Sequence, residues 1–164
     1  SAFLKNKNAS SAEALDAFRK TDGNCLMMGE IGNIQSAALM IELSQVSEQQ
    51  LFTHHAMTTE KLLGYFRNAL LRTGTYSDER MAQEQVSEAF DIHVLCERDL
   101  NGKRYIKQIS EIVSGADTTC RILYRYSGGC YEKTGNPTKG LLNRMKEHLE
   151  DGEKEKAAAF FSEV

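Results

Sequence analysis

The sequence predicts an α/β protein in which a parallel sheet is followed by antiparallel strands and C-terminal helices. In the first half, helical and strand-like segments alternate along the chain, which is the order expected of parallel strands joined by crossover helices. In the second half, apolar and polar residues alternate one by one, which is the spacing of antiparallel strands. Apolar residues make up 41% of the 164 residues, enough for a packed core.

Capping residues mark the helix starts in the first half. Ser10 has Glu13 three residues later, which forms a capping box. Asn33 and Thr58 stand directly before segments with helical apolar spacing, and a further helix is expected to start at Ser77. The other predicted elements are a helix at 11–21, a strand at 24–29, a helix at 34–46, a strand at 50–54 and a helix at 59–73.

Three antiparallel strands are predicted in the second half. Residues 91–98 alternate with strand spacing, and a return strand is expected at 104–113. Between them, Asn101-Gly102 predicts a tight turn, because both residues tolerate a positive φ. The segment "CRILYRY" is the third candidate strand.

Two helices are predicted after these strands. In "GNPTKGLLNRMKEHL", Asn136 is expected to cap a helix whose first position is Pro137, since proline is favoured there. The last helix is expected from about residue 153, with apolar residues only from Ala157 to Phe161. The chain is therefore expected to end in helices.

The charge balance is ordinary for a soluble protein, and the cysteine pattern favours the cytoplasm. The net charge of −3 differs from that of a basic nucleic-acid-binding domain, so no direct nucleic-acid binding is predicted. No apolar run is long enough for a transmembrane helix, and the first residues lack the order of a signal peptide. The four cysteines are interpreted as reduced thiols; a zinc site is the alternative, although their spacing does not fit one.

An acidic residue follows the first predicted strand. In "NCLMMGEIGN" an apolar run ends at Gly29, and Glu30 is the next residue. Ligands of open α/β sheets bind beyond the carboxyl ends of the strands, where a carboxylate can orient a water molecule or hold Mg²⁺. The alternative interpretation is an acid in solvent near the start of the next helix.

Two histidines end the next predicted strand, in "FTHHA". Strand alternation places Thr53 and His55 on one side and His54 on the other. The ends of two parallel strands lie at the same edge of a sheet, so a histidine here can reach a phosphate. A solvent-exposed polar pair at a strand end is the alternative interpretation.

Three segments in this order resemble a known family. They are "NCLMMGEIG", "QLFTHHAMTTEKLLGYFRNALLRTG" and "AQEQVSEAFDIHVLCERDLNGKRYIKQISEIV". Together they are similar to the second half of the type II/type IV secretion traffic ATPases, which include the motors of conjugation, tight-adherence pili and type IV pili. The matching motifs are Gly29-Glu30-Ile31 (Walker B region), Thr53-His54-His55-Ala56 (His box), Glu97-Arg98, Gly102-Lys103-Arg104 and Glu111-Ile112.

The resemblance implies a partial RecA-like P-loop NTPase core with an added antiparallel β segment and C-terminal helices. It implies one domain over residues 1–164. Within that domain, about 10–75 is the Walker B and His-box region, about 76–128 a helix and antiparallel strands, and about 129–164 the C-terminal helices.

The resemblance also implies a function and a set of site residues. Glu30 and His55 are the implied catalytic residues, with His55 contacting the γ-phosphate, while Thr53 and Gly29 are implied to bind the cofactor. The implied cofactors of the intact protein are ATP and Mg²⁺, and no metal-ligand set is predicted within this chain. The implied partners are identical subunits in a hexamer and a secretion or pilus machinery, with the protein peripheral at the inner face of the membrane.

The sequence departs from the family pattern at three positions. Arginine is usual in the family where Gly32, Tyr65 and Gln83 stand, and arginine binds phosphate in a bidentate way that these residues cannot reproduce. These departures favour an alternative function, a non-catalytic module that keeps the fold for subunit contacts. An unrelated small α/β binding domain is a third interpretation.

The phosphate-binding loop of the family is missing from the sequence. No G-x-x-x-x-G-K-[ST] occurs, and the nearest segment, "GGCYEKT", has Glu132 at the second glycine. In the family this loop precedes the Walker B strand. We therefore expect the chain to be the C-terminal part of a longer motor, and we expect the chain alone to bind no ATP tightly and to be inactive.

Overall fold

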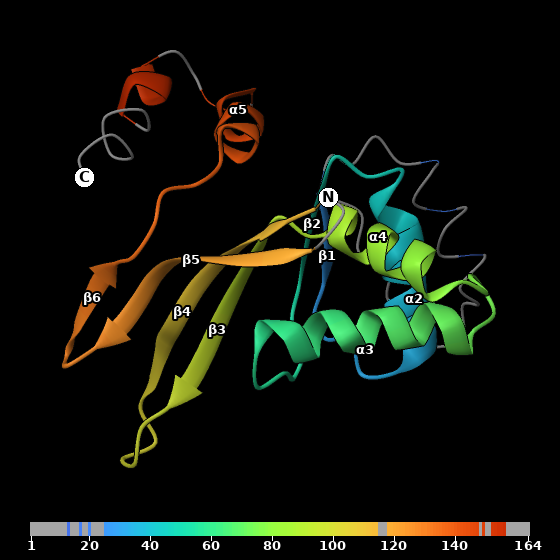
Figure 1. Ribbon diagram of the computed structural model, residues 1–164, viewed down its shortest axis with the longest axis horizontal. Helices are drawn as coiled ribbons and strands as arrows, with labels where there is room; N and C mark the ends of the chain where they lie inside the picture. The colour runs from blue at the N-terminus through green and yellow to red at the C-terminus, as the bar shows by residue number, and fades with distance from the viewer. Residues whose placement is uncertain are drawn as a thin grey trace. The chain divides into compact units, whose positions relative to one another are not determined.

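The computed structural model describes residues 25–114, 118–147, 149 and 152–156, together with Glu13, Ala17 and Lys20 (Figure 1). The chain divides into two compact units, within residues 1–90 and 91–164, and each is described by itself. The predicted Ser10 cap and most of the 11–21 helix lie outside the described residues, as does the apolar end of the last helix.

The first unit contains a two-stranded parallel sheet. Strand β1 (Cys25–Met28) pairs with β2 (Gln49–Phe52), so that Cys25 lies opposite Gln49 and Met28 opposite Phe52. Helix α2 (Ile34–Ser44) makes the crossover between the two strands. The side chains of Met27 and Leu51, which are register partners, are 71% and 58% exposed, so one face of this sheet is open.

Three helices cover the other face of the sheet. Helices α2, α3 (Thr59–Arg72) and α4 (Glu79–Ala89) gather on one side of β1 and β2 (Figure 1). Phe66 of α3 is completely buried, with ring centroids 5.5 Å from Phe52 and 5.0 Å from Phe90. The strands are therefore anchored from one side by an aromatic cluster.

The predicted caps of α2 and α3 are confirmed, and that of α4 is corrected by one residue. The Asn33 side chain accepts from the Ser36 amide at 2.9 Å, and Thr58 accepts from Lys61 at 3.2 Å. Helix α4 is capped by Asp78 rather than Ser77, because the Asp78 carboxylate accepts from the amide of Met81. Aspartate and serine are about equally favoured as N-caps, and the negative charge of Asp78 also complements the helix dipole.

The second unit is an antiparallel meander followed by a helix. Its strands are β3 (Ile92–Arg98), β4 (Arg104–Val113), β5 (Thr119–Ser127) and β6 (Cys130–Lys133), paired in chain order. Strand β6 was not predicted; it lies within "GGCYEKT" and pairs with β5 through a turn at Gly128-Gly129, both with positive φ. The first three strands confirm the predicted antiparallel segment.

The turn between β3 and β4 differs from the predicted two-residue turn. The Gly102 amide donates to the Asp99 carbonyl, and only Gly102 has a positive φ, of 79°. Asn101 is not left-handed, because the Asp99 carboxylate organises the loop by accepting from the amides of Asn101 and Lys103. This arrangement is typical of a turn that ends in a glycine bulge.

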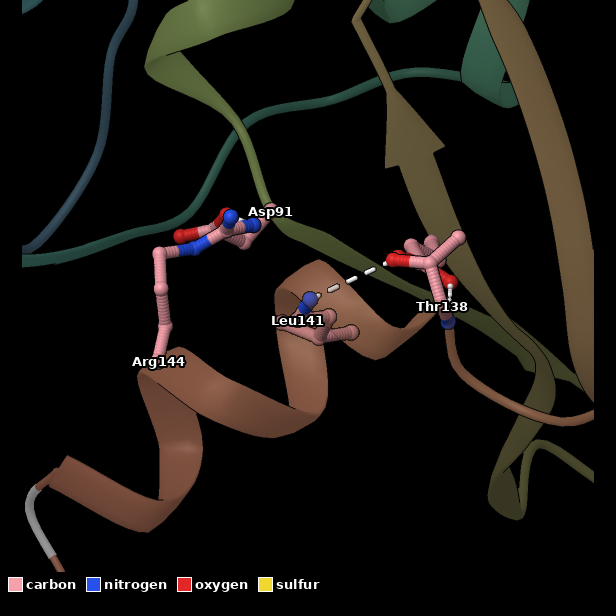
Figure 2. Close-up of polar contacts among 5 residues, drawn as sticks. Asp91, Thr138, Leu141 and Arg144 are labelled. Atoms are coloured by element: carbon pink, nitrogen blue, oxygen red, sulfur yellow. Dashed lines mark hydrogen bonds and ion pairs between the residues drawn. The ribbon is translucent and has the colours of Figure 1, made fainter.

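Helix α5 (Lys139–Glu147) starts later than predicted, and Thr138 takes the place of Asn136 as the cap. The Thr138 hydroxyl accepts from the Leu141 amide at 3.2 Å, as Figure 2 shows. Thr138 also donates its amide and hydroxyl to the carboxylate of Glu111, which is 2% exposed. Pro137 therefore precedes the helix, because the acceptor that organises its start is the buried Glu111.

A second contact fixes α5 one turn further on. The guanidinium of Arg144 binds the carboxylate of Asp91 (Figure 2). The Asp91 backbone carbonyl in turn accepts from the Ile112 amide at 2.9 Å, next to Glu111 in β4. The helix is thus tied to the start of β3 and to β4.

A charged and aromatic group lies on the β3–β6 sheet. The Glu97 carboxylate accepts from Lys107 at 2.6 Å and from the Tyr105 hydroxyl at 3.0 Å, and these bonds lower the pKa of Glu97 below its ordinary value. The same bonds raise the pKa of Tyr105 and of Lys107. The Tyr105 ring lies 5.0 Å from that of Tyr126.

Among the described residues, no helix is long and apolar enough to span a bilayer.

Candidate functional site

The candidate site lies where β1 and β2 end. Because the two strands are parallel, their carboxyl ends lie at the same edge, which brings residues 29–31 beside residues 53–55. The pairing continues past the strands, since the Ile31 amide donates to the Thr53 carbonyl at 2.9 Å. The Thr53 hydroxyl donates to the Gly29 carbonyl. The expected placement of Glu30 and Thr53 on adjacent parallel strand ends is confirmed.

Glu30 and His55 come together at this edge. The Glu30 Oε1 and His55 Nε2 atoms are 3.4 Å apart, and the side chains are 60% and 95% exposed. The contact is an ion pair only when His55 is protonated, and pairs this exposed contribute at most about 1 kcal/mol to stability. The pair is therefore a poor stabilising device, and both groups remain open to a ligand.

His54 has different neighbours from His55, in line with the expected strand alternation. Its Nδ1 atom lies 2.7 Å from the carbonyl oxygen of Ile31. Its ring is half-buried, with its centroid 4.4 Å from that of Tyr65 and 5.7 Å from that of Phe66. The two neighbouring histidines thus have different environments, one in solvent and one packed on α3.

The backbone conformation of the β1–α2 loop does not require glycine at its two glycine positions. Neither Gly29 nor Gly32 has a positive φ, and an added Cβ at either would meet no heavy atom within 4 Å. The carbonyl of Gly29, in contrast, is used as the acceptor for Thr53. A cofactor contact at Gly29, as the resemblance implies, would therefore use the open space beside its Cα atom.

The residues at this edge fit one side of a magnesium–nucleotide site. Glu30 offers a carboxylate of the kind that holds Mg²⁺ or a water molecule, and His55 offers a nitrogen that can donate to a phosphate. No group of three or more His, Cys, Asp or Glu side chains comes together within the described ranges. No phosphate-loop motif occurs among the 164 residues, so this sequence supplies neither the amides nor the lysine of such a loop.

Sequence analysis did not predict two structural features. The first is the packing of His54 on Tyr65, whose signal was the alternation that turns His54 towards the helices. The second is the role of Glu111, which was named only as part of a motif. A carboxylate among the apolar residues of β4 was the available signal for a buried anchor.

Comparison with known proteins supports a likeness in fold. No protein-family model and no curated protein sequence matches the chain. A solved structure that does match is the VirB11 ATPase from the Brucella suis type IV secretion system, in complex with sulphate. The TM-score is 0.54 at 14% sequence identity, over 63% of this chain and 32% of that protein. The chain thus spans about a third of the VirB11 ATPase, and what they share is a secretion-ATPase-like fold.

Proposed function

We propose that this chain is the C-terminal part of an ATPase that drives secretion or conjugation, and that its first unit is part of a RecA-like core. The observation that carries the proposal is the meeting of Glu30 and His55 at the carboxyl edge of a parallel pair. The fold likeness to the VirB11 ATPase supports the same assignment.

Each residue at this edge has a distinct proposed task. Glu30 orients the attacking water and accepts its proton, and His55 donates a hydrogen bond to the γ-phosphate. Thr53 and Gly29 hold the strand ends in place through their mutual bond. When bound, Mg²⁺ neutralises charge on the phosphate oxygens. The main cradle for ATP would come from a phosphate loop elsewhere in the intact protein.

The proposed partners follow from the same assignment. Motors of this family act as homo-hexamers, and we propose that the intact protein assembles in this way at a secretion or pilus machinery. The protein would then lie peripherally at the inner face of the membrane, in the cytoplasm. Direct nucleic-acid contact is not part of the proposal, in line with the net charge of −3.

One observation favours a non-catalytic module as the second candidate. Tyr65 stands where the family often has an arginine, and it packs on the ring of His54 instead of offering a cation. Gly32 and Gln83 likewise replace arginines that would bind phosphate. A module of this kind would keep the fold for subunit contacts without hydrolysing ATP.

The decisive experiment measures ATP hydrolysis by the full-length source protein with and without Glu30→Gln. Glutamine keeps the shape of the side chain but can neither take a proton nor carry charge. We expect turnover to fall by roughly 10²-fold or more while nucleotide binding persists. His55→Ala should cost less, because it removes one phosphate contact among several.

Glu48→Gln is the matched control. Glu48 is an exposed carboxylate directly before β2, at the opposite end of the parallel pair, so its loss should leave turnover unchanged. If the intact protein carries a phosphate loop and neither Glu30→Gln nor His55→Ala changes hydrolysis, the non-catalytic module replaces the motor.

A further inference from the structure

The Glu30 segment is held on both sides by the end of β2. Before Glu30, the Gly29 carbonyl accepts from the Thr53 hydroxyl. After it, the Ile31 amide donates to the Thr53 carbonyl, and the Ile31 carbonyl lies 2.7 Å from His54 Nδ1. The Ile31 side chain is only 1% exposed. Glu30 is therefore an exposed carboxylate on a backbone segment with little freedom to move.

The hydrogen bond between His54 and the Ile31 carbonyl requires one tautomer of the imidazole. A carbonyl oxygen can only accept a hydrogen bond, so His54 Nδ1 must carry the hydrogen. The packing of the ring on Tyr65 and Phe66 sets its orientation. His54 thus connects helix α3 to the backbone directly after Glu30.

We propose that His54 is a positioning residue that holds the Glu30 carboxylate within reach of His55. This inference rests on the proposed function, since it concerns how the hydrolytic carboxylate is kept in place. The Nδ1–H donor restrains the Ile31 carbonyl, and the restraint passes through one peptide to Glu30. Without it, Glu30 keeps its chemistry, but its backbone is no longer held at this place beside His55.

Two substitutions separate the donor from the ring. His54→Asn places an amide N–H close to the position of Nδ1, so it keeps the bond to Ile31 and loses most of the ring packing. His54→Phe keeps an aromatic ring against Tyr65 and has no donor. A merely structural His54 would be replaced better by Phe, whereas a positioning His54 is replaced better by Asn.

The first measurement is the tautomer of His54 in this chain, from long-range proton–nitrogen NMR correlations of the imidazole. We expect a protonated Nδ1. A neutral ring with the proton on Nε2 would overturn the proposal, because no hydrogen bond to Ile31 could then exist. This readout does not depend on ATP hydrolysis.

The second measurement is steady-state hydrolysis by the full-length source protein. We expect His54→Phe to lower kcat by about 10-fold, with KM for magnesium-ATP changed less than about twofold, since misplaced groups slow the chemical step. His54→Asn should recover most of that loss. The control is Thr73→Ala, which removes a hydroxyl that lies within hydrogen-bond distance of the Ala69 and Leu70 carbonyls and of the Thr75 hydroxyl, at the far end of α3. It should leave kcat unchanged.

The outcomes distinguish this inference from the proposed function. If Glu30→Gln abolishes turnover while His54→Phe retains the full kcat, the positioning role is wrong and the motor stands. If Glu30→Gln has no effect, the proposed function fails and the positioning role for hydrolysis fails with it. The tautomer then still decides whether the contact to Ile31 exists.

Discussion

Replacing Glu111 tests whether a buried carboxylate holds helix α5 on the sheet. Glu111 is 2% exposed and accepts two hydrogen bonds, from the amide and the hydroxyl of Thr138. Hydrogen bonds to a charged group contribute about 1.5–3 kcal/mol each. Part of this is offset because alanine no longer requires burial of a charge. We therefore expect Glu111→Ala to lower the free energy of unfolding by about 2–4 kcal/mol.

A double-mutant cycle assigns that loss to the contact with Thr138. Thr138→Val keeps the shape and removes the hydroxyl, which also caps α5 through the Leu141 amide, so it should cost about 2–3 kcal/mol. Because the two side chains share one contact, the double variant should lose at least about 1 kcal/mol less than the sum.

The assay is urea denaturation followed by far-UV circular dichroism, with hydrogen exchange of the α5 amides to locate the loss. The matched control is Glu132→Ala, which removes an exposed carboxylate from the same sheet and should change stability by less than about 0.5 kcal/mol. Strictly additive losses for Glu111 and Thr138, or α5 exchange as slow as in the wild type, would refute the anchoring role.

Two further predictions concern the same unit. Gly135→Ala should lower the free energy of unfolding by about 1–3 kcal/mol, because its Cβ would lie 2.7 Å from the Ile122 carbonyl oxygen. Gly140→Ala, within α5, should stabilise the protein slightly. Equal melting temperatures for the two variants would contradict this. The pKa of Glu97 is lower in the folded protein than in the unfolded chain, so its hydrogen bonds stabilise the fold at pH values above its unfolded pKa of about 4.3. This stabilisation is lost as the pH falls through the lower pKa of the folded state. The wild type should therefore lose more stability than Glu97→Gln between about pH 5 and pH 3, and parallel acid-denaturation curves would show that the Glu97–Lys107 bond does not form in solution.

Periodicity predicted the type of the parallel strands, their helices and the first three antiparallel strands, but not the residues at which the elements end. The parallel pair and the first three antiparallel strands follow from spacing and turn residues, which are local properties of the chain. The start of α5 was misplaced because its cap depends on Glu111, which lies 27 positions earlier in the sequence. Strand β6 was missed because two consecutive glycines form its turn and only four residues follow in the strand.

The placement of the candidate site residues was predictable for a related reason. Parallel strands bring their carboxyl ends together, so Glu30 and Thr53 had to be neighbours once the strands were recognised. Alternation then placed His54 apart from His55. The hydrogen bond from His54 to Ile31 was not predictable, since it depends on the path of the β1–α2 loop and on the ring of Tyr65, neither of which leaves a periodic signal.

The two units differ in how far apart in the chain their strand partners lie, which has a consequence for folding order. Every strand of the β3–β6 meander pairs with its neighbour in sequence. The bond between Thr53 and Gly29, in contrast, joins positions 24 apart and requires the α2 crossover to close first. Closing a longer loop costs more entropy before any pairing is gained, so non-local contacts form slowly. The edge that carries Glu30 and His55 should accordingly form later than the meander during refolding.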